Sequence, residues 1–491
     1  MPTSVSSAPT TSRFEKAALH VPEALLQRYN TSGPRYTSYP TVPDWTDTFG
    51  PHAFTQALKQ FQAQQNEANA AEPDQSTPLS LYTHIPFCTE RCLFCGCNVV
   101  ITRQTEQAEK YLDFLSREID MLASHTPDTH AVVQYHWGGG TPTYLTPDQM
   151  RRLFGQHKRL YNFADDAEIS IEVDPRVTTD EHLETLRHLG FNRVSMGVQD
   201  FNDTTQQAVK RIQSLEQTAH LTQYSRALGF SSVNMDLIYG LPHQTRTTFE
   251  ATLDHIIALD PDRIALYNFA YVPWISPHQK KIDPAALPDG TTKFEIFSMA
   301  IDRLTSAGYT YMGMDHFAKP DDELTRAFVD GTLYRNFMGY TTKAGSQMVS
   351  AGVSAISGLE HAYAQNHRKL SQYYDAIQAG HLATMRGLAV SDTDRLHRDI
   401  IQAILCQGRL TYSQISQTYG IDFNTQFAPA LARLAPMAED GLVELHNDHL
   451  QLLPLGRVFS RNVAMCFDPY LAQRQEDHQA DGNPPAFSKT L

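Results

Sequence analysis

Short apolar runs alternate with segments of helical spacing between residues 80 and 269, and this alternation constrains the fold more than any other feature. The runs predict six strands, at 80–86, 131–137, 168–173, 191–198, 231–239 and 262–269. Segments with polar faces and helical spacing lie between them, at 105–123, 147–160, 180–189, 215–228 and 246–258. Strands that alternate with helices form βαβ units, so the sequence predicts an α/β fold with a parallel sheet.

Two arrangements of such a sheet fit this pattern, an open doubly wound sheet and a partial barrel. No G-x-G-x-x-G follows the first predicted strand, so a dinucleotide-binding fold has no support. Polar residues follow the ends of several different strands, which is where (β/α) barrels place their active sites. We therefore expect a partial (β/α)6 barrel of the TIM type.

A second, smaller module is expected from about residue 395. Helical patterns at 395–406, 411–419 and 427–438 precede two short predicted strands at 442–446 and 450–453, an order typical of a winged helix. Residues 391–470 contain six Arg, no Lys and nine Asp or Glu, which leaves a net charge of −3. Because modules that bind DNA are normally basic, we expect a lid or scaffold.

The chain is expected to have four parts. Residues 1–34 are interpreted as a flexible arm, 35–360 as the barrel domain with an arm segment that reaches over its mouth, 361–470 as the mostly helical domain and 471–491 as a loose tail. Residues 315–358 are rich in Gly, Asp and aromatic residues and are expected to form long functional loops.

Charge and hydropathy exclude several classes of protein. The 491 residues carry a formal net charge of −14, which argues against a general nucleic-acid or anionic-membrane partner but allows a local basic pocket. No run approaches the roughly 20 apolar residues of a membrane span, and residues 1–13 lack the apolar core of a secretory signal. We expect a cytoplasmic protein, and a monomer is compatible with its acidic surface.

Four of the six cysteines lie within ten residues, directly after the first predicted strand. Cys88, Cys92 and Cys95 form the pattern C-x-x-x-C-x-x-C, and thiolates are ligands for iron–sulfur clusters or zinc. Structural zinc usually takes two distant cysteine pairs, and no second pair is present. Three thiolates instead fill three corners of a cubane cluster and leave one iron open. A zinc site completed by Cys97 or His84, or structural thiols, are the alternatives.

Further candidate residues follow the other predicted strands. The glycine-rich turn 138–142 follows the second strand, and its glycines would let a ligand approach the backbone closely. Glu172 ends the third strand, Gln199 follows the fourth, Asp236 lies in the fifth and Ala270 follows the sixth. Each could be a structural turn or a satisfied cap, but in a barrel such positions converge on one mouth.

The cysteine spacing and its placement resemble the radical S-adenosylmethionine (SAM) superfamily. From about residue 34 to residue 470 the chain resembles one of its families, the oxygen-independent coproporphyrinogen III oxidases. The matching segments are RYTSYPT (35–41), LYTHIPFCTERCLFCGCN (81–98), HWGGGTPTYL (136–145), EISIEVDPR (168–176), SMGVQDF (195–201), DLIYGLP (236–242), GMDHFAKPDDEL (313–324), NFMGYTT (336–342), GVSAIS (352–357) and RNVAMCFD (461–468).

This resemblance implies an activity and its cofactors. In the family a [4Fe–4S] cluster and SAM generate a 5′-deoxyadenosyl radical. The radical drives the anaerobic oxidative decarboxylation of coproporphyrinogen III, in which the ring A and B propionates become vinyl groups. The product is protoporphyrinogen IX, a precursor of haem. A reductant protein such as a flavodoxin is an implied partner.

The resemblance also implies residue roles. Cluster ligands would be Cys88, Cys92 and Cys95, and catalytic residues would be Cys97 and Tyr82. A first SAM would contact Tyr82, Gly139, Glu172 and Ile356, and a second would contact Phe94, Gly140, Thr141, Gln199, Arg211, Asp236 and Ala270. Arg211 is the permanent cation of this set and suits a carboxylate, although a surface arginine on a helix is the alternative.

Two points narrow the resemblance. A sister group of haem-chaperone-like proteins shares the three cysteines and the glycine turn, but usually lacks a cysteine at the position of Cys97. The thiol of Cys97 favours the oxidases, with a bystander thiol as the alternative. Because the substrate carries four carboxylates, we expect residues 336–342, flanked by Arg335 and Lys343, to supply donors for them.

Overall fold

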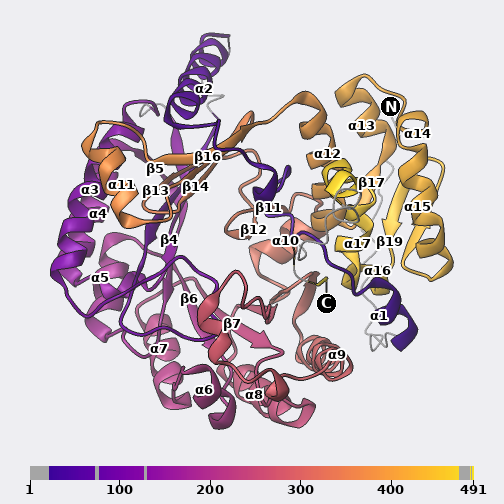
Figure 1. The fold of residues 1–491 in the computed structure, drawn as a ribbon, viewed down its shortest axis with the longest axis horizontal. Coiled ribbons are helices and arrows are strands. Elements are labelled where there is room, and N and C mark those ends of the chain that lie inside the picture. Colours follow the sequence, from indigo (N-terminus) through magenta and orange to yellow (C-terminus); the bar gives the residue numbers. More distant parts are fainter. Residues whose placement is uncertain (1–21, 72–76, 127–129, 475–486, 488, 491) are drawn as a thin grey trace, which may run out of the picture.

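One twelve-stranded sheet organises the computed structural model, which describes residues 22–71, 77–126, 130–474, 487, 489 and 490. Its strand order is β16-β15-β14-β13-β1-β4-β5-β6-β7-β8-β10-β9. The middle of the sheet is curved into an open barrel with helices on its outer side (Figure 1). No helix among the described residues is both long and apolar enough to cross a membrane.

The predicted partial barrel is confirmed by six neighbouring parallel strands. They are β1 (Leu79–Ile85), β4 (Ala131–Gly139), β5 (Asn162–Val173), β6 (Arg193–Gln199), β7 (Ser232–Tyr239) and β8 (Arg263–Asn268). The crossovers contain α3 (Glu106–Ala123), α4 (Pro147–Leu160), α5 (Asp180–Leu189), α6 (Asp203–Val209), α7 (Leu215–Ala227) and α8 (Arg246–Leu259). Each predicted strand and helix of the barrel is present, and α6 is an addition.

Local sequence explains where these elements begin and which faces they bury. Along β6, Val194, Met196 and Val198 are buried and the residues between them are only partly buried, which is the two-residue period of a strand. Thr146 and Thr179 begin α4 and α5, since each hydroxyl accepts a backbone N–H of the first turn.

Short strands extend the sheet beyond both ends of the barrel. The extensions are β13 (Gln347–Ala351), β14 (Ile356–Leu359), β15 (Ala362–Asn366) and β16 (Thr384–Ala389) beside β1, and β10 (His316–Ala318) and β9 (Thr310–Gly313) beside β8. Residues 315–358 also contain α10 (Glu323–Val329) and the hairpin of β11 (Tyr334–Asn336) and β12 (Gly339–Thr341). The prediction of long loops is therefore wrong here, because strands of three to five residues are too short to show a period.

The C-terminal region has the element order predicted for a winged helix. It comprises α12 (Asp392–Gln402), a π-helical turn (Ala403–Gln407), β17 (Arg409–Thr411), α13 (Tyr412–Tyr419), α14 (Phe423–Gln426), α15 (Ala428–Glu439), β18 (Val443–Leu445), β19 (His449–Leu452), α16 (Pro454–Val458) and α17 (Ser460–Met465). The three strands form a small antiparallel sheet in the order β17-β19-β18. This domain lies beside the open side of the barrel (Figure 1).

The predicted domain boundary at residue 360 cuts through the main sheet. Strands β15 and β16 lie after it, and β15 pairs with both β14 and β16. We propose a boundary near residue 390 instead.

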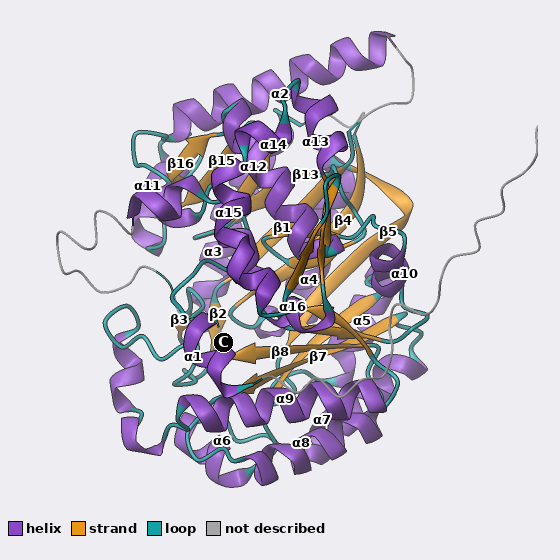
Figure 2. Cartoon of the chain, turned by 90° about the vertical axis from the view of Figure 1, so that its right-hand side faces the viewer, coloured by secondary structure: helices purple, strands orange, loops and turns teal. Residues whose placement is uncertain are grey.

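Three further α-helices are α2 (Pro51–Ala71), α9 (Gly290–Ser306) and α11 (Leu370–Gln378). Figure 2 shows α2 at one end of the molecule and α8 at the other.

Parts of the predicted arm and tail are packed against the C-terminal domain. Residues 22–34 contain α1 (Glu23–Tyr29), and the Tyr29 hydroxyl donates to Asp440 Oδ2 at 2.5 Å. Ser32 forms an antiparallel β-bridge with Lys489. The prediction of a loose arm is therefore wrong for residues 22–34, while residues 1–21 and most of the tail lie outside the described residues.

Candidate active site

The cysteine loop begins where β1 ends, at the barrel mouth. β2 (Phe87–Cys88) pairs in parallel with β3 (Val100–Ile101), which holds the two ends of the loop together. Within the loop the Cys95 N–H donates to the Cys92 carbonyl at 3.3 Å. All of these cysteines are free thiols. The turn thus presents several thiols on one short, fixed segment.

Two guanidinium groups contact the thiol of Cys92. Arg176 Nη2 and Arg211 Nη1 each lie 3.6 Å from Cys92 Sγ. Both arginines also bind Asp174, and although burial opposes its ionisation, Arg211 and Arg176 lower the pKa of Asp174 to about 2. Two positive charges therefore lie beside this thiol. Arg211 is buried, so the alternative of a surface arginine is wrong.

The other thiols of the loop differ in acidity. A hydrogen bond between Cys95 and Cys97 lowers the pKa of Cys95 to about 7 and raises the pKa of Cys97. Burial raises the pKa of Cys88 to about 11, and its sulfur lies 3.4 Å from Thr141 Oγ1. Cys88 therefore needs a metal ion to become a thiolate at neutral pH, whereas Cys95 ionises there readily.

The glycine turn after β4 lies against the start of the cysteine loop. The Gly140 N–H donates to the Ile85 carbonyl at 2.8 Å, and the Thr141 N–H donates to the Phe87 carbonyl at 2.9 Å. Gly139 has a φ of +120°, and a Cβ there would lie 2.6 Å from the His84 ring. The turn needs glycine for its conformation and for this close approach.

Glu172 and Tyr82 meet beside this turn. Glu172 Oε2 accepts the Gly139 N–H at 3.1 Å, and Glu172 Oε1 lies 3.6 Å from His136 Nε2. Burial opposes the ionisation of Glu172, but the contacts with His136 and Gly139 outweigh it and lower its pKa. Tyr82 stacks on His136 with ring centroids 5.9 Å apart, and its hydroxyl lies 3.0 Å from His84 Nδ1.

Asp236 lies on the inner face of the barrel below these groups. Its oxygens accept hydrogen bonds from Ser195 Oγ at 3.0 Å and Asn234 Nδ2 at 2.9 Å. Burial and the nearby charge of Glu172 raise the pKa of Asp236 to about 6. Asp236, Glu172 and His136 line a cavity of about 140 Å³ inside the barrel.

The remaining predicted residues surround this centre at different depths. Gln199 ends β6 with a φ of +70°. The amide of Gln279 donates to the carbonyls of Ala270 at 3.2 Å and Phe94 at 3.5 Å. Ile356 lies farther from the cysteine loop, in β14. Its carbonyl accepts a hydrogen bond from the Ser350 hydroxyl at 2.5 Å, and Ser350 is paired with Tyr82 in the sheet.

Three neighbours of the predicted residues were not assigned a role from the sequence. Asp174 and Arg176 lie directly after β5 in a segment that the family resemblance includes, and their position at a strand end could have identified them. His136 lies in the middle of β4, where an inward-facing histidine has no distinct sequence pattern.

Comparisons with known proteins agree with this geometry. Residues 82–256 match the model of the radical SAM superfamily, and residues 390–459 match that of the HemN C-terminal domain. Oxygen-independent coproporphyrinogen III oxidases from Escherichia coli K12 and Synechocystis are 46% and 42% identical over 456 residues, covering 93% and 92% of this chain and 97% and 96% of theirs. The solved E. coli radical SAM coproporphyrinogen III oxidase has a TM-score of 0.86 and 44% identity, over 92% of this chain and 100% of that one.

The chain belongs to the oxygen-independent coproporphyrinogen III oxidase family. It is therefore a radical SAM enzyme with a [4Fe–4S] cluster and SAM as cofactors, and coproporphyrinogen III is its substrate.

The residues of this oxidase fit the cluster. Three thiols on one turn would supply soft ligands, and the guanidinium groups beside Cys92 would offset the negative charge of a thiolate-bound cluster. Next to them, the Gly139–Gly140 backbone packs so closely on His84, Pro86 and Phe87 that neither position has room for a Cβ. The chemistry of these residues therefore suits a cluster, with the glycine turn directly beside it.

Proposed function

We propose that this oxidase decarboxylates coproporphyrinogen III with the residues at the barrel mouth. The observation that supports this assignment is the position of Glu172, which binds the glycine turn beside the cysteine loop and lines the same cavity as Asp236. When bound, the cluster supplies an electron that cleaves SAM to methionine and a 5′-deoxyadenosyl radical. Cys88, Cys92 and Cys95 would hold the cluster.

The first SAM would bind along the line from Tyr82 to Glu172. Glu172 stays ionised at neutral pH because its pKa is lowered, so its carboxylate can bind the methionine ammonium group. The Gly139 backbone would lie against the same moiety, and Ile356 would contact the first SAM from β14. The hydroxyl of Tyr82 stays protonated, since burial raises its pKa well above the usual value.

A second SAM site would lie deeper, around Arg211 and Asp236. The Nη1 and Nη2 groups of Arg211 are engaged by Cys92, Asp174 and the Gly197 carbonyl, whereas its buried Nε has no hydrogen-bond partner among the described residues. That N–H is a donor for the carboxylate of a second SAM. The other contacts of this site would come from Phe94, Gly140, Thr141, Gln199, Asp236 and Ala270.

The substrate step follows from these positions. Removal of a hydrogen atom from the β-carbon of a propionate leaves a substrate radical. That radical loses carbon dioxide and one electron and becomes a vinyl group, and the electron passes to an acceptor. We propose that Cys97, an exposed thiol hydrogen-bonded to Cys95, acts beside Tyr82 in this reaction.

We also propose that the enzyme works in the cytoplasm as a monomer, with a reduced protein such as a flavodoxin as electron donor. The acidic surface favours neither nucleic acid nor anionic membranes as partners.

Anaerobic reconstitution tests the proposed function. The wild-type protein with cluster, reductant, SAM and coproporphyrinogen III should form protoporphyrinogen IX and 5′-deoxyadenosine, and Cys92→Ala should lose both the cluster absorbance and the products. Cys97→Ser should retain the cluster and form much less protoporphyrinogen IX. Cys466→Ala, a buried cysteine of the C-terminal domain, is the matched control. Haem binding without product in the wild type would contradict the proposal.

A further inference from the structure

Arginines from distant parts of the sequence gather where the barrel meets the C-terminal domain. Arg35 precedes the barrel, Arg335 lies in β11 and Arg461 in α17. Arg335 and Arg461 are only 4% and 6% exposed. Asp315 lies 2.7 Å from Arg35 Nη1 and offsets one of the three charges. Arg461 donates to backbone carbonyls, including that of Pro34 at 2.9 Å, which are neutral acceptors. The region is thus strongly cationic within a chain of net charge −14.

Arg335 carries the unsatisfied part of this charge. Its Nε and Nη1 are buried and have no hydrogen-bond partner among the described residues. The guanidinium carbon lies 5.1 Å from the ring centroid of Tyr340, its partner across the hairpin. A buried guanidinium without an anion is costly, so such a site normally exists for one.

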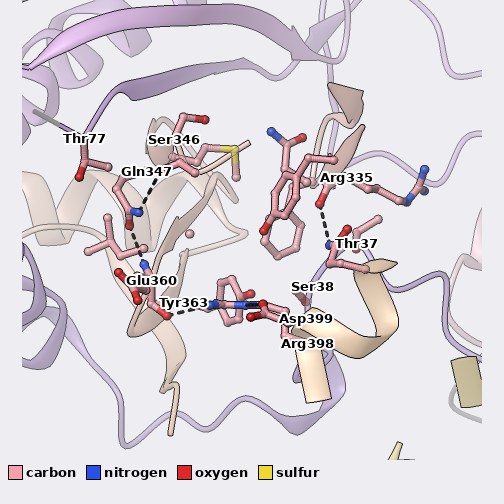
Figure 3. A pocket seen from close by; sticks show the side chains of 18 residues that line it. Thr37, Ser38, Thr77, Arg335, Ser346, Gln347, Glu360, Tyr363, Arg398 and Asp399 are labelled. Carbon is pink, nitrogen blue, oxygen red and sulfur yellow. Dashed lines mark hydrogen bonds and ion pairs between the residues drawn. The ribbon is translucent and has the colours of Figure 1, made fainter. Parts of the chain in front are cut away.

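Two cavities lie near Arg335, and the direction of its side chain indicates which of them the guanidinium faces. One, of about 370 Å³, lies between the edge of the main sheet and α12, and Arg335 is one of the residues that line it. Figure 3 shows the Arg335 side chain extending away from Gln347 and Glu360, which line that cavity. The other is the barrel cavity, which is lined by Tyr340 and by Asn336, the residue next to Arg335. Arg335 thus lines the first cavity, whereas its guanidinium extends away from Gln347 and Glu360 and lies over the ring of Tyr340, a residue that lines the barrel cavity.

His316 connects Arg335 to the barrel cavity. It lines that cavity, and its ring centroid lies 5.1 Å from that of Tyr340. Its Nδ1 is buried and has no hydrogen-bond partner among the described residues. Burial and then the positive charge of Arg335 lower the pKa of His316 to about 3, so the imidazole is neutral. A neutral imidazole can donate one hydrogen bond to an anion that the guanidinium holds.

We propose that Arg335, assisted by His316, binds a propionate carboxylate of the tetrapyrrole that is not decarboxylated. This inference rests on the proposed function. The two reacting carboxylates leave as carbon dioxide, so a cationic group that holds substrate, half-reacted intermediate and product in one site must bind a propionate that remains. The carboxylates of Glu172 and Asp236, which line the same cavity, would repel this propionate and orient the molecule.

Binding and turnover of four proteins test the inference. Arg335→Met should raise the Kd and KM for coproporphyrinogen III about 10- to 100-fold, since it removes charge-assisted hydrogen bonds. It should weaken the binding of protoporphyrinogen IX by a similar factor, because the same propionate is present there. Arg335→Lys should restore part of the affinity as a point charge without the fork geometry. Arg187→Met on the outer helix α5, which removes a hydrogen bond to the Leu228 carbonyl, is the matched control and should bind like the wild type.

Thermal unfolding separates a binding role from a structural one. With no ligand, Arg335→Met should have an unchanged or higher Tm, because it removes an unpaired buried charge. Coproporphyrinogen III should raise the Tm of the wild type and raise that of the variant less. Unchanged Kd values, or weakened binding of coproporphyrinogen III alone, would overturn the inference. Binding that depends on Arg335 in a wild-type protein that forms no product would refute the proposed function and leave the propionate site standing.

Discussion

Gly140 shows how closely single residues are constrained at the barrel mouth. A Cβ at this position would lie 2.7 Å from the backbone carbon of Pro86 and 2.8 Å from the Phe87 oxygen. Both atoms lie in the short segment between β1 and Cys88, so they cannot move without moving Cys88. The close contact between the glycine turn and the start of the cysteine loop therefore depends on the absence of one methyl group.

Replacing Gly140 with alanine should therefore disturb the site and the fold together. We expect Gly140→Ala to lower the free energy of unfolding by about 1–3 kcal/mol and to lower the cluster content after anaerobic reconstitution. Gly155→Ala is the control, since a Cβ in the middle of α4 meets no atom within 4 Å and should stabilise the protein by about 1 kcal/mol. Urea unfolding and the iron content of both variants check this, and an unchanged Gly140→Ala protein would contradict it.

At this scale the sequence predicted the cysteines and the glycine turn because their chemistry needs unusual residues at fixed spacing. It did not assign Asp174 and Arg176, because a D-P-R segment after a strand is also an ordinary turn. Their role depends on the distance from Arg176 to Cys92, 84 positions earlier in the chain, which only the folded barrel establishes.

Among the elements, α3 is joined to the added edge of the sheet by one buried carboxyl group. Glu118 accepts hydrogen bonds from the Gly352 N–H at 2.7 Å, the Asn366 amide at 2.6 Å and the Tyr373 hydroxyl at 2.7 Å. These partners lie after β13, at the end of β15 and in α11. Burial raises the pKa of Glu118 to about 7, so the connection is sensitive to pH.

The direction of the Glu118 pKa shift determines how the stability of the protein changes with pH. The folded protein binds the Glu118 proton more tightly than the unfolded chain, whose carboxyl has a pKa near 4.5. The contribution of Glu118 to the free energy of unfolding is complete below about pH 4.5 and is lost as the pH rises through about 7. The total change is about 3 kcal/mol. Glu118→Gln should remove this part of the pH dependence, as measured by urea unfolding at pH 5 and pH 7.5. Glu109→Gln, on the exposed face of α3, should retain it; equal slopes for both variants would contradict the assignment.

The strands and helices of the barrel could be predicted because each is long enough to repeat its period several times. The short strands β13 to β16 could not, since their partners decide their conformation. β13 is buried along its whole length and pairs with β1, so no alternation of polar and apolar residues marks it.

Across the whole molecule, the segment after α1 connects the barrel to the C-terminal domain. The Tyr36 hydroxyl donates to buried Asp468 at 2.9 Å, and Trp45 stacks on Tyr363 of β15 with ring centroids 5.4 Å apart. Arg35 binds Asp315 beside β10. The segment thus contacts the residues beside β10, strand β15 and the C-terminal domain at once.

Deleting residues 1–45 should therefore separate two properties of the enzyme. The cysteine loop lies outside the deleted contacts, so the cluster should still assemble, whereas formation of protoporphyrinogen IX should be lost. Deletion of residues 1–21 is the control. It leaves the contacts of Arg35, Tyr36 and Trp45 in place and should retain activity. Iron analysis and the anaerobic product assay measure both properties, and full activity of the longer deletion would exclude a role for the arm.

The pairing of β1 with β13 also has a consequence for synthesis of the protein. Leu79 pairs with Gln347, so the chain must be extended by 268 residues before this edge of β1 can be covered. At about 5–20 residues per second this takes about 15–50 seconds. During that interval the strand that leads into the cysteine loop has an exposed edge, on which a ribosome-bound chaperone or another nascent chain can pair. We therefore expect β1, and the cysteine loop that follows it, to be fully ordered only after β13 has been synthesised.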